Sequence, residues 1–127
     1  MHKLIILIEP PADDPDFDVR WPEFITLSAI IPGLRRETTS RIVHKMFGNY
    51  SCQLIHELYF ESAGALREAL NSPIGIQAGK SLQRITGGRV TLLIAEHLED
   101  DPARYANRVQ IHPQQGEHSA PEQGSTP

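Results

Sequence analysis

The sequence predicts an α+β fold in which a four-stranded antiparallel sheet carries its helices on one face. Short β-rich apolar runs alternate with stretches of helical spacing in the order β-α-β-β-α-β. Proline and glycine pairs stand where these runs end. The length of 127 residues fits one domain with a tail.

An apolar run and an amphipathic stretch open the chain. Residues 3–9 form the first predicted strand, and two adjacent prolines stop it because proline cannot donate to a ladder. Asp14 or Asp16 can cap a helix that continues to about Ile31. Its side chains fall at spacings that place one stripe towards a core: Phe17, Trp21, Phe24, Ile25, Leu27 and Ser28.

A hairpin of two strands is expected next. Residues 34–47 are predicted as a long strand with mixed faces, following the Pro32-Gly33 pair that ends the helix. Gly48-Asn49 provides turn chemistry. Residues 52–61 then form the third strand.

The second helical region is predicted in two segments. Ser62 is a good cap for residues 63–70, and Ser72 with Pro73 opens a second segment that continues to Ile85. Gly87-Gly88 then ends the helix, and a fourth strand follows at residues 89–96. This order of elements is the ferredoxin-like, split βαβ arrangement.

The two faces of the predicted sheet differ in what covers them. Alternation turns one set of side chains towards the helices: Leu4, Ile6, Ile8, Leu54, Leu58, Phe60, Val90, Leu92 and Ile94. The opposite set is Ile5, Leu7, Ile55, Glu57, Tyr59, Thr91, Leu93 and Ala95. Apolar faces of this kind are normally buried by association, so we expect a homodimer in which two sheets enclose a barrel.

The composition changes near Leu98, which divides the chain into a domain of residues 1–98 and a tail of residues 99–127. The tail has five acidic residues against two basic ones and four of the 10 prolines. Residues 108–112 alternate polar and apolar and could add a strand to a sheet edge, on this chain or on a partner. We therefore expect the tail to dock on the partner subunit.

Charge and cysteine content exclude several classes of protein. A net charge of -4 leaves no basic stripe for nucleic acid. The apolar run Leu4 to Ile8 is too short for a signal sequence or a membrane span. One cysteine, Cys52, can form neither an internal disulfide nor a zinc cluster, so we expect a reducing, cytoplasmic location.

Glu57 and Tyr59 are the candidate catalytic residues because they share the apolar, barrel-facing side of the third strand. A desolvated carboxylate there would have a raised pKa and suit general acid or base chemistry. The alternative for Glu57 is an ion pair with an arginine such as Arg41 or Arg35. Tyr59 could donate its hydroxyl to a ligand or simply fill the barrel.

Four apolar side chains are expected to line a ligand pocket between the sheet and the first helix: Trp21, Phe24, Ile55 and Leu93. His56 has the parity of the helix-facing side and is expected to be a hydrogen-bonded core histidine. His44 lies on the outer half of the second strand. Neither histidine belongs to a cluster with ligand spacing, so we predict no metal site.

Several short motifs together make the chain resemble the EthD family, named for ethyl tert-butyl ether degradation, of the dimeric α+β barrel superfamily. The motifs are residues 3–8, Asp16-Phe17, residues 32–36, residues 55–62, residues 69–73 and residues 91–96. The resemblance implies ferredoxin-like protomers that pair sheet to sheet. It also implies a histidine late in the first helix, but no histidine occurs between His2 and His44.

The resemblance and the residues together predict a protein that binds a small, largely apolar organic metabolite in catabolism, with or without proton transfer by Glu57 and Tyr59. One alternative is a non-catalytic carrier, or an accessory protein of a degradative oxygenase system. Another alternative is an oxygenase of the same superfamily that uses haem or no cofactor. The sequence does not specify the cofactor, the substrate or the reaction.

Overall fold

The computed structural model of the chain describes residues 1–9 and 15–103. Its helices and strands follow the predicted order, with the second helical region in two segments: β1 (His2–Ile8), α1 (Phe17–Ser28), β2 (Arg36–Arg41), β3 (Leu54–Phe60), α2 (Ala63–Asn71), α3 (Pro73–Thr86) and β4 (Val90–Glu96). All of them lie in one compact unit, residues 1–43 and 51–97.

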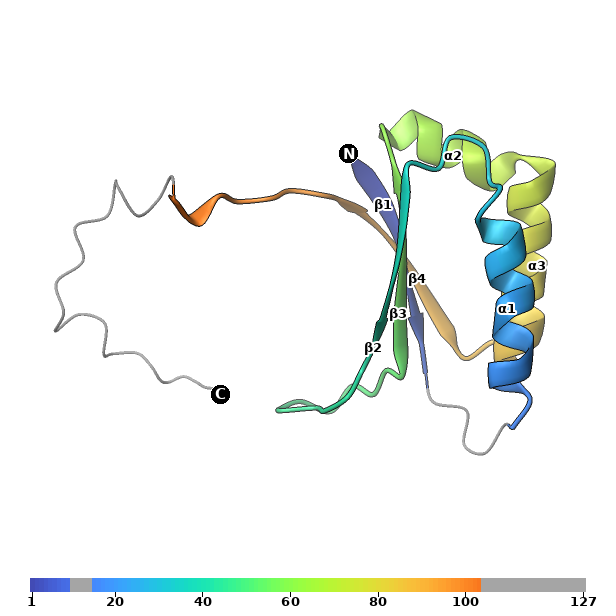
Figure 1. Cartoon of the computed structure of the whole chain (residues 1–127), viewed down its shortest axis with the longest axis vertical. Helices are drawn as coiled ribbons and strands as arrows, with labels where there is room; N and C mark the ends of the chain where they lie inside the picture. The colour runs from blue at the N-terminus through green and yellow to red at the C-terminus, as the bar shows by residue number, and fades with distance from the viewer. Residues whose placement is uncertain (10–14, 104–127) are drawn as a thin grey trace, which may run out of the picture. The chain divides into compact units, whose positions relative to one another are not determined.

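The four strands form one antiparallel sheet in the order β2-β3-β1-β4. Figure 1 shows all three helices on the same side of this sheet, with α1 and α3 side by side. The α+β, ferredoxin-like class is therefore confirmed. The strand order leaves β2 and β4 as the two edges.

The core lies between the central strands and the helices. Alternate residues of β1 face it, with Leu4, Ile6 and Ile8 no more than 6% exposed. On β3 the helix-facing positions are Leu54, His56, Leu58 and Phe60, and all four are buried. The predicted alternation of β1 and β3 is thus confirmed.

Serine caps define the α2–α3 corner. The Ser62 hydroxyl accepts from the backbone N–H of Ala65 and begins α2. Ser72 ends α2 and begins α3, since its hydroxyl donates to the Ala69 carbonyl at 2.6 Å and accepts from the Gly75 N–H at 3.0 Å. Pro73 then occupies the first turn of α3, where its missing N–H costs nothing.

Two predicted elements are shorter than expected. The first helix ends at Ser28 rather than Ile31, and β2 ends at Arg41 rather than at residue 47. Beyond Arg41, a single backbone hydrogen bond from Ile42 to Gln53 continues the pairing. Val43 is 91% exposed, so the chain there has no surface to pack against and the ladder stops.

The helix-facing side of β4 differs from the prediction in its burial. Leu92 and Ile94 pair with Ile6 and Leu4 and therefore point to the helix side, but they are 53% and 58% exposed. The helices cover the central strands and leave this edge open. The sequence pattern gives side-chain direction correctly, but burial also depends on where the helices lie.

The second unit contains residues 44–50 and the C-terminal segment from Leu98. Met46 and Phe47 in this unit are 90% and 85% exposed. His44, which we placed on the second strand, belongs to this unit and lies after the end of β2. The predicted strand at residues 108–112 and its docking lie outside the described residues.

Replacing Gly75 with alanine tests the packing at the α2–α3 corner. A Cβ atom at this position would lie 2.0 Å from the Ala69 carbonyl oxygen. We expect Gly75→Ala to destabilise the fold by about 2 kcal/mol or more, because backbone must move to admit the methyl group. Denaturant unfolding measures the difference.

The matched control is Gly79→Ala in the same helix, where a Cβ would meet nothing within 4 Å. This change should stabilise the protein by about 0.5 to 1 kcal/mol through helix propensity. Equal effects of the two substitutions would contradict the proposed packing.

Candidate functional site

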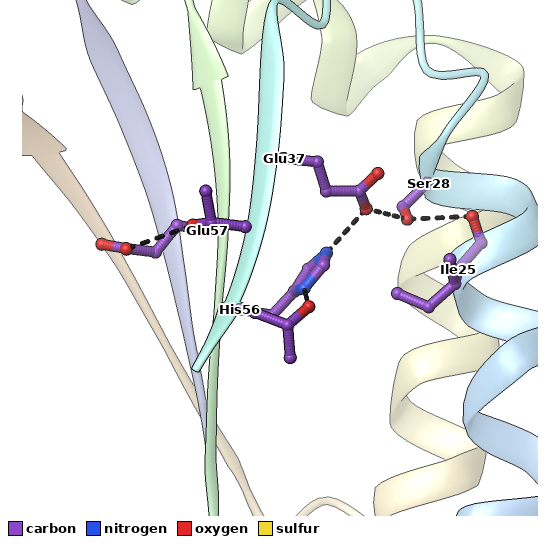
Figure 2. Close-up of polar contacts among 7 residues, drawn as sticks. Ile25, Ser28, Glu37, His56 and Glu57 are labelled. Carbon is purple, nitrogen blue, oxygen red and sulfur yellow. Dashed lines mark hydrogen bonds and ion pairs between the residues drawn. The ribbon is translucent and has the colours of Figure 1, made fainter. Parts of the chain in front are cut away.

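A chain of polar side chains lies on the helix-facing side of the sheet (Figure 2). Thr39 on β2 contacts Nδ1 of His56 through its Oγ1 at 2.7 Å. Nε2 of His56 is 2.6 Å from Oε2 of Glu37, which also lies on β2. Ser28 at the end of α1 donates to the same carboxylate oxygen at 2.5 Å. The chain therefore joins α1, β2 and β3.

The hydrogen-bond partners fix the direction of the protons in this chain. A carboxylate oxygen only accepts, so Nε2 of neutral His56 carries the hydrogen that faces Glu37. Nδ1 is then an acceptor, and the Thr39 hydroxyl donates to it. Thr39 thus donates to His56, and His56 and Ser28 both donate to Glu37.

Aromatic rings enclose the imidazole of His56, which is 1% exposed. Trp21 and Phe24 of α1 pack on it edge-to-face at centroid distances of 5.4 and 5.7 Å. Burial lowers the pKa of His56, and the hydrogen bond and charge of Glu37 oppose this effect without overcoming it. His56 is therefore neutral at pH 7.

The opposite side of the sheet holds a second polar cluster, centred on Glu57. Its carboxylate pairs with the Lys3 ammonium at 2.8 Å and accepts from the hydroxyls of Tyr59 at 3.3 Å and Thr38 at 3.5 Å. Burial would raise the pKa of Glu57, but the hydrogen bond and charge of Lys3 hold it below its usual value. Glu57 is thus an ion-paired carboxylate, and its partner is Lys3 rather than Arg41 or Arg35.

Tyr59 is 3% exposed although it lies on the face without helices. The guanidinium of Arg36 lies 4.2 Å from its ring centroid, and the His97 ring packs edge-to-face on it at 5.0 Å. The Lys3 ammonium lies 5.3 Å from the same centroid. Cations and an imidazole therefore cover the ring.

An apolar cavity of about 60 Å³ lies between the sheet and the helices. Ile6 and Leu58 form its floor, Phe24 and Leu82 form walls, and Leu92 lines it from the exposed edge strand. Every lining residue is apolar or glycine. No titratable side chain from the described residues reaches this cavity.

The structure divides the predicted site residues between the two sides of the sheet. Trp21 and Phe24 lie on the helix side, and only Phe24 lines the cavity. Ile55 shares the open side with Glu57 and Tyr59, and Leu93 pairs with Ile5 on that side. Figure 2 shows Glu57 pointing away from His56 across the sheet. The six residues thus do not form one pocket.

Three residues of the helix-side chain were missed by the sequence analysis as functional groups: Ser28, Glu37 and Thr39. The signal that brings them together is the β2–β3 register, which pairs Thr39 with His56. His56 itself was correctly expected to be a hydrogen-bonded core histidine. The helix position at which the resemblance implies a histidine lies near Phe24, and here that ring packs on the imidazole supplied by β3.

The described ranges hold neither a metal-ligand group nor a membrane-spanning helix. No three His, Cys, Asp or Glu side chains of residues 1–9 and 15–103 come together as a metal-ligand group. None of the helices in the same ranges has the length and apolar character needed to span a membrane. Cys52 lies just before β3, half-buried, and its thiol contacts the Leu54 carbonyl at 3.2 Å.

Comparisons with known proteins define the class. No protein-family model and no curated protein matches the chain. Among solved structures, a dimeric ferredoxin-like protein of unknown function from Jannaschia is 14% identical, with a TM-score of 0.61 over 76% of this chain and 98% of that one. SnoaB, a cofactor-independent oxygenase from Streptomyces nogalater, is 15% identical, with a TM-score of 0.59 over 80% and 96%. The protein thus has the ferredoxin-like fold.

A third structure is similar in sequence as well as in fold. An ethyl tert-butyl ether degradation (EthD) family protein from Bacillus halodurans is 33% identical, covering 77% of this chain and 99% of that one, with a TM-score of 0.71. The chain belongs to the EthD family.

Acid should weaken the fold through His56. The native state favours neutral His56, so its contribution to stability is complete above the unfolded pKa of about 6.5 and declines as the pH falls below it. We expect the unfolding midpoint to decrease between about pH 7 and 5. His44→Gln, which removes an exposed imidazole, is the control, and His56→Gln should flatten the dependence. If His56→Gln did not change the pH dependence of the unfolding midpoint, the loss of stability in acid could not be attributed to His56.

Glu57 should add a separate loss of stability at lower pH. Its native pKa is lowered, so its contribution is complete above the unfolded value of about 4.5 and is lost as the pH falls through the native pKa. We expect Glu57→Gln to reduce the pH dependence of unfolding in this range. Glu68→Gln, at an exposed position of α2, should leave it unchanged.

Proposed function

We propose that this EthD-family protein binds a small, largely apolar organic molecule in the cavity between the sheet and the helices. The observation that carries the proposal is the wholly apolar lining of that cavity, since binding sites for small molecules are concave and mostly apolar. Leu92 is half exposed and gives the cavity an edge from which a ligand can enter.

The size and lining of the cavity restrict the ligand. A volume of about 60 Å³ admits a compact group of a few non-hydrogen atoms. Because no lining side chain can donate or accept a proton, the cavity supports binding rather than chemistry. Of the roles considered from the sequence, a carrier or an accessory protein of a degradative oxygenase fits this lining best.

Proton transfer by Glu57 and Tyr59 has less support. Glu57 is paired with Lys3, and its lowered pKa makes it a weak base and a carboxylate at neutral pH. Both side chains lie on the open side of the sheet, away from the cavity. If Glu57→Gln left the turnover of an identified substrate unchanged, the hypothesis of a catalytic role for Glu57 would be contradicted.

We also propose that the open face of the sheet pairs with a second copy of the chain. Ile5, Leu7, Ile55 and Leu93 give this face an apolar surface around the Lys3–Glu57 pair. Several structural neighbours are described as dimeric proteins with a ferredoxin-like fold. Sedimentation at micromolar concentration should give the mass of a dimer; a monomer would contradict this arrangement.

A ligand screen with a cavity-filling variant tests the binding proposal. Short ethers, hydroxylated aromatics and small ketoacids are tested by thermal shift, with product analysis of each hit. Gly79 lies at the cavity on an exposed surface of α3, so Gly79→Leu should fill the space and abolish the shift. Gln77→Leu, exposed on the same helix outside the cavity, should retain it.

Each outcome of the ligand screen supports or contradicts a particular role for the cavity. Ligand binding without conversion supports a carrier. Binding that survives Gly79→Leu would place the ligand elsewhere and contradict the proposal. Conversion of a hit that Gly79→Leu abolishes would replace the carrier role by catalysis in the cavity.

A further inference from the structure

Thr39 is the exposed end of a polar chain in which His56 and Ser28 are buried and Glu37 is partly buried. The residue lies on the edge strand β2, and its side chain shares the helix-facing side with Glu37 and Arg41. Its hydroxyl contacts Nδ1 of a histidine that is 1% exposed. An exposed threonine thus makes a hydrogen bond to an imidazole that is shielded from water.

The order of contacts is that of an activated nucleophile. Thr39 donates to the lone pair on Nδ1, and the second imidazole nitrogen donates to the Glu37 carboxylate at 2.6 Å. A hydroxyl, a base and a group that orients the base are the three parts that nucleophilic catalysis requires. Ser28 holds the carboxylate in place from α1 at 2.5 Å.

The surroundings supply two further features. Arg41 is exposed two residues along the strand, about 7 Å from Thr39 on the same side. Among the described residues, no ion pair uses its guanidinium. Trp21, partly exposed and in contact with the His56 ring, provides an apolar wall. A positive charge and an apolar surface thus flank the hydroxyl.

We propose that Thr39, His56 and Glu37 form an acyl-transfer site at the β2 edge, and that small carboxylic esters are its substrates. Thr39 and His56 are the catalytic residues of this site, and Glu37 is a positioning residue. This activity is separate from ligand binding in the apolar cavity and does not depend on it.

The proposed reaction is ester hydrolysis, with water as the second substrate. Thr39 Oγ1 bonds to the ester carbonyl carbon while its proton passes to Nδ1 of His56, and the negative charge on the carbonyl oxygen is stabilised by Arg41. The C–O bond to the alcohol then breaks, and the alcohol leaves with the proton from Nδ1. Water adds to the acyl carbon and gives its proton to Nδ1. The acid departs and Thr39 regains its proton.

Pairing through the open sheet face would leave this site accessible. Thr39 and Arg41 point to the helix side, whereas the apolar residues that we propose for pairing point to the other side. The site is also complete within one chain. Its activity should therefore not depend on whether the protein is a monomer or a dimer.

Hydrolysis of p-nitrophenyl acetate by the full-length protein tests the proposal. We expect release of p-nitrophenolate above the buffer rate and an acetyl group on Thr39, located by mass spectrometry of peptides. Thr39→Val should reduce the protein-dependent rate by about 100-fold or more, and Thr39→Ser should retain activity. Thr39→Val leaves Nδ1 of the buried His56 without its donor, which destabilises the fold, so its unfolding midpoint is measured beside its rate to show that the variant is folded under the assay conditions.

Thr38→Val is the matched control, because Thr38 is the neighbouring threonine on the opposite side of the same strand. It should keep the wild-type rate. The proposal is overturned by a rate equal to that of buffer, by equal rates for wild type and Thr39→Val, or by acetyl groups found only on lysines or the N-terminus.

The role of Glu37 is tested by the pH profile. Glu37 raises the pKa of His56 against the effect of burial. In the Glu37→Gln variant, the increase of the hydrolysis rate with pH should therefore occur at lower pH, and the plateau rate should be lower. A reduced rate that still increases over the wild-type pH range would indicate a structural role only. It would contradict the assignment of Glu37 as a positioning residue.

Discussion

The alternation of side chains along β3 decides which groups of this protein can act together. His56 and Glu57 are neighbours in sequence, but the strand sends one towards the helices and the other to the open face. Each finds its own partners there: Glu37 on one side and Lys3 on the other. A sheet only one backbone thick thus separates two polar systems that the sequence places side by side.

The imidazole of His56 has to be fully hydrogen-bonded because it is buried. An imidazole without partners in this position would cost about 1 to 3 kcal/mol in lost solvation. Thr39 and Glu37 satisfy both ring nitrogens, and the edges of Trp21 and Phe24 enclose the ring. The same contacts tie the edge strand to α1. Rigid placement of the chain is also what an activated hydroxyl requires.

Strand alternation, serine caps and turn residues were sufficient to predict the order of elements, the two sheet faces and the core position of His56. The partners of these residues were not predictable. Glu37 and Thr39 reach His56 only through the β2–β3 register, which no local sequence pattern encodes. Lys3 was overlooked as the partner of Glu57 because the β1–β3 register places it one strand away, opposite Tyr59.

Ser72 closes the end of one helix and the start of the next with a single hydroxyl. Gly75 then packs against the Ala69 carbonyl so closely that a Cβ atom would lie 2.0 Å from its oxygen. A peptide tag or reporter inserted at this elbow would break both caps and separate the contact. The exposed connection between β2 and β3 has neither constraint, and it is the place where engineering can lengthen the chain without disturbing the sheet.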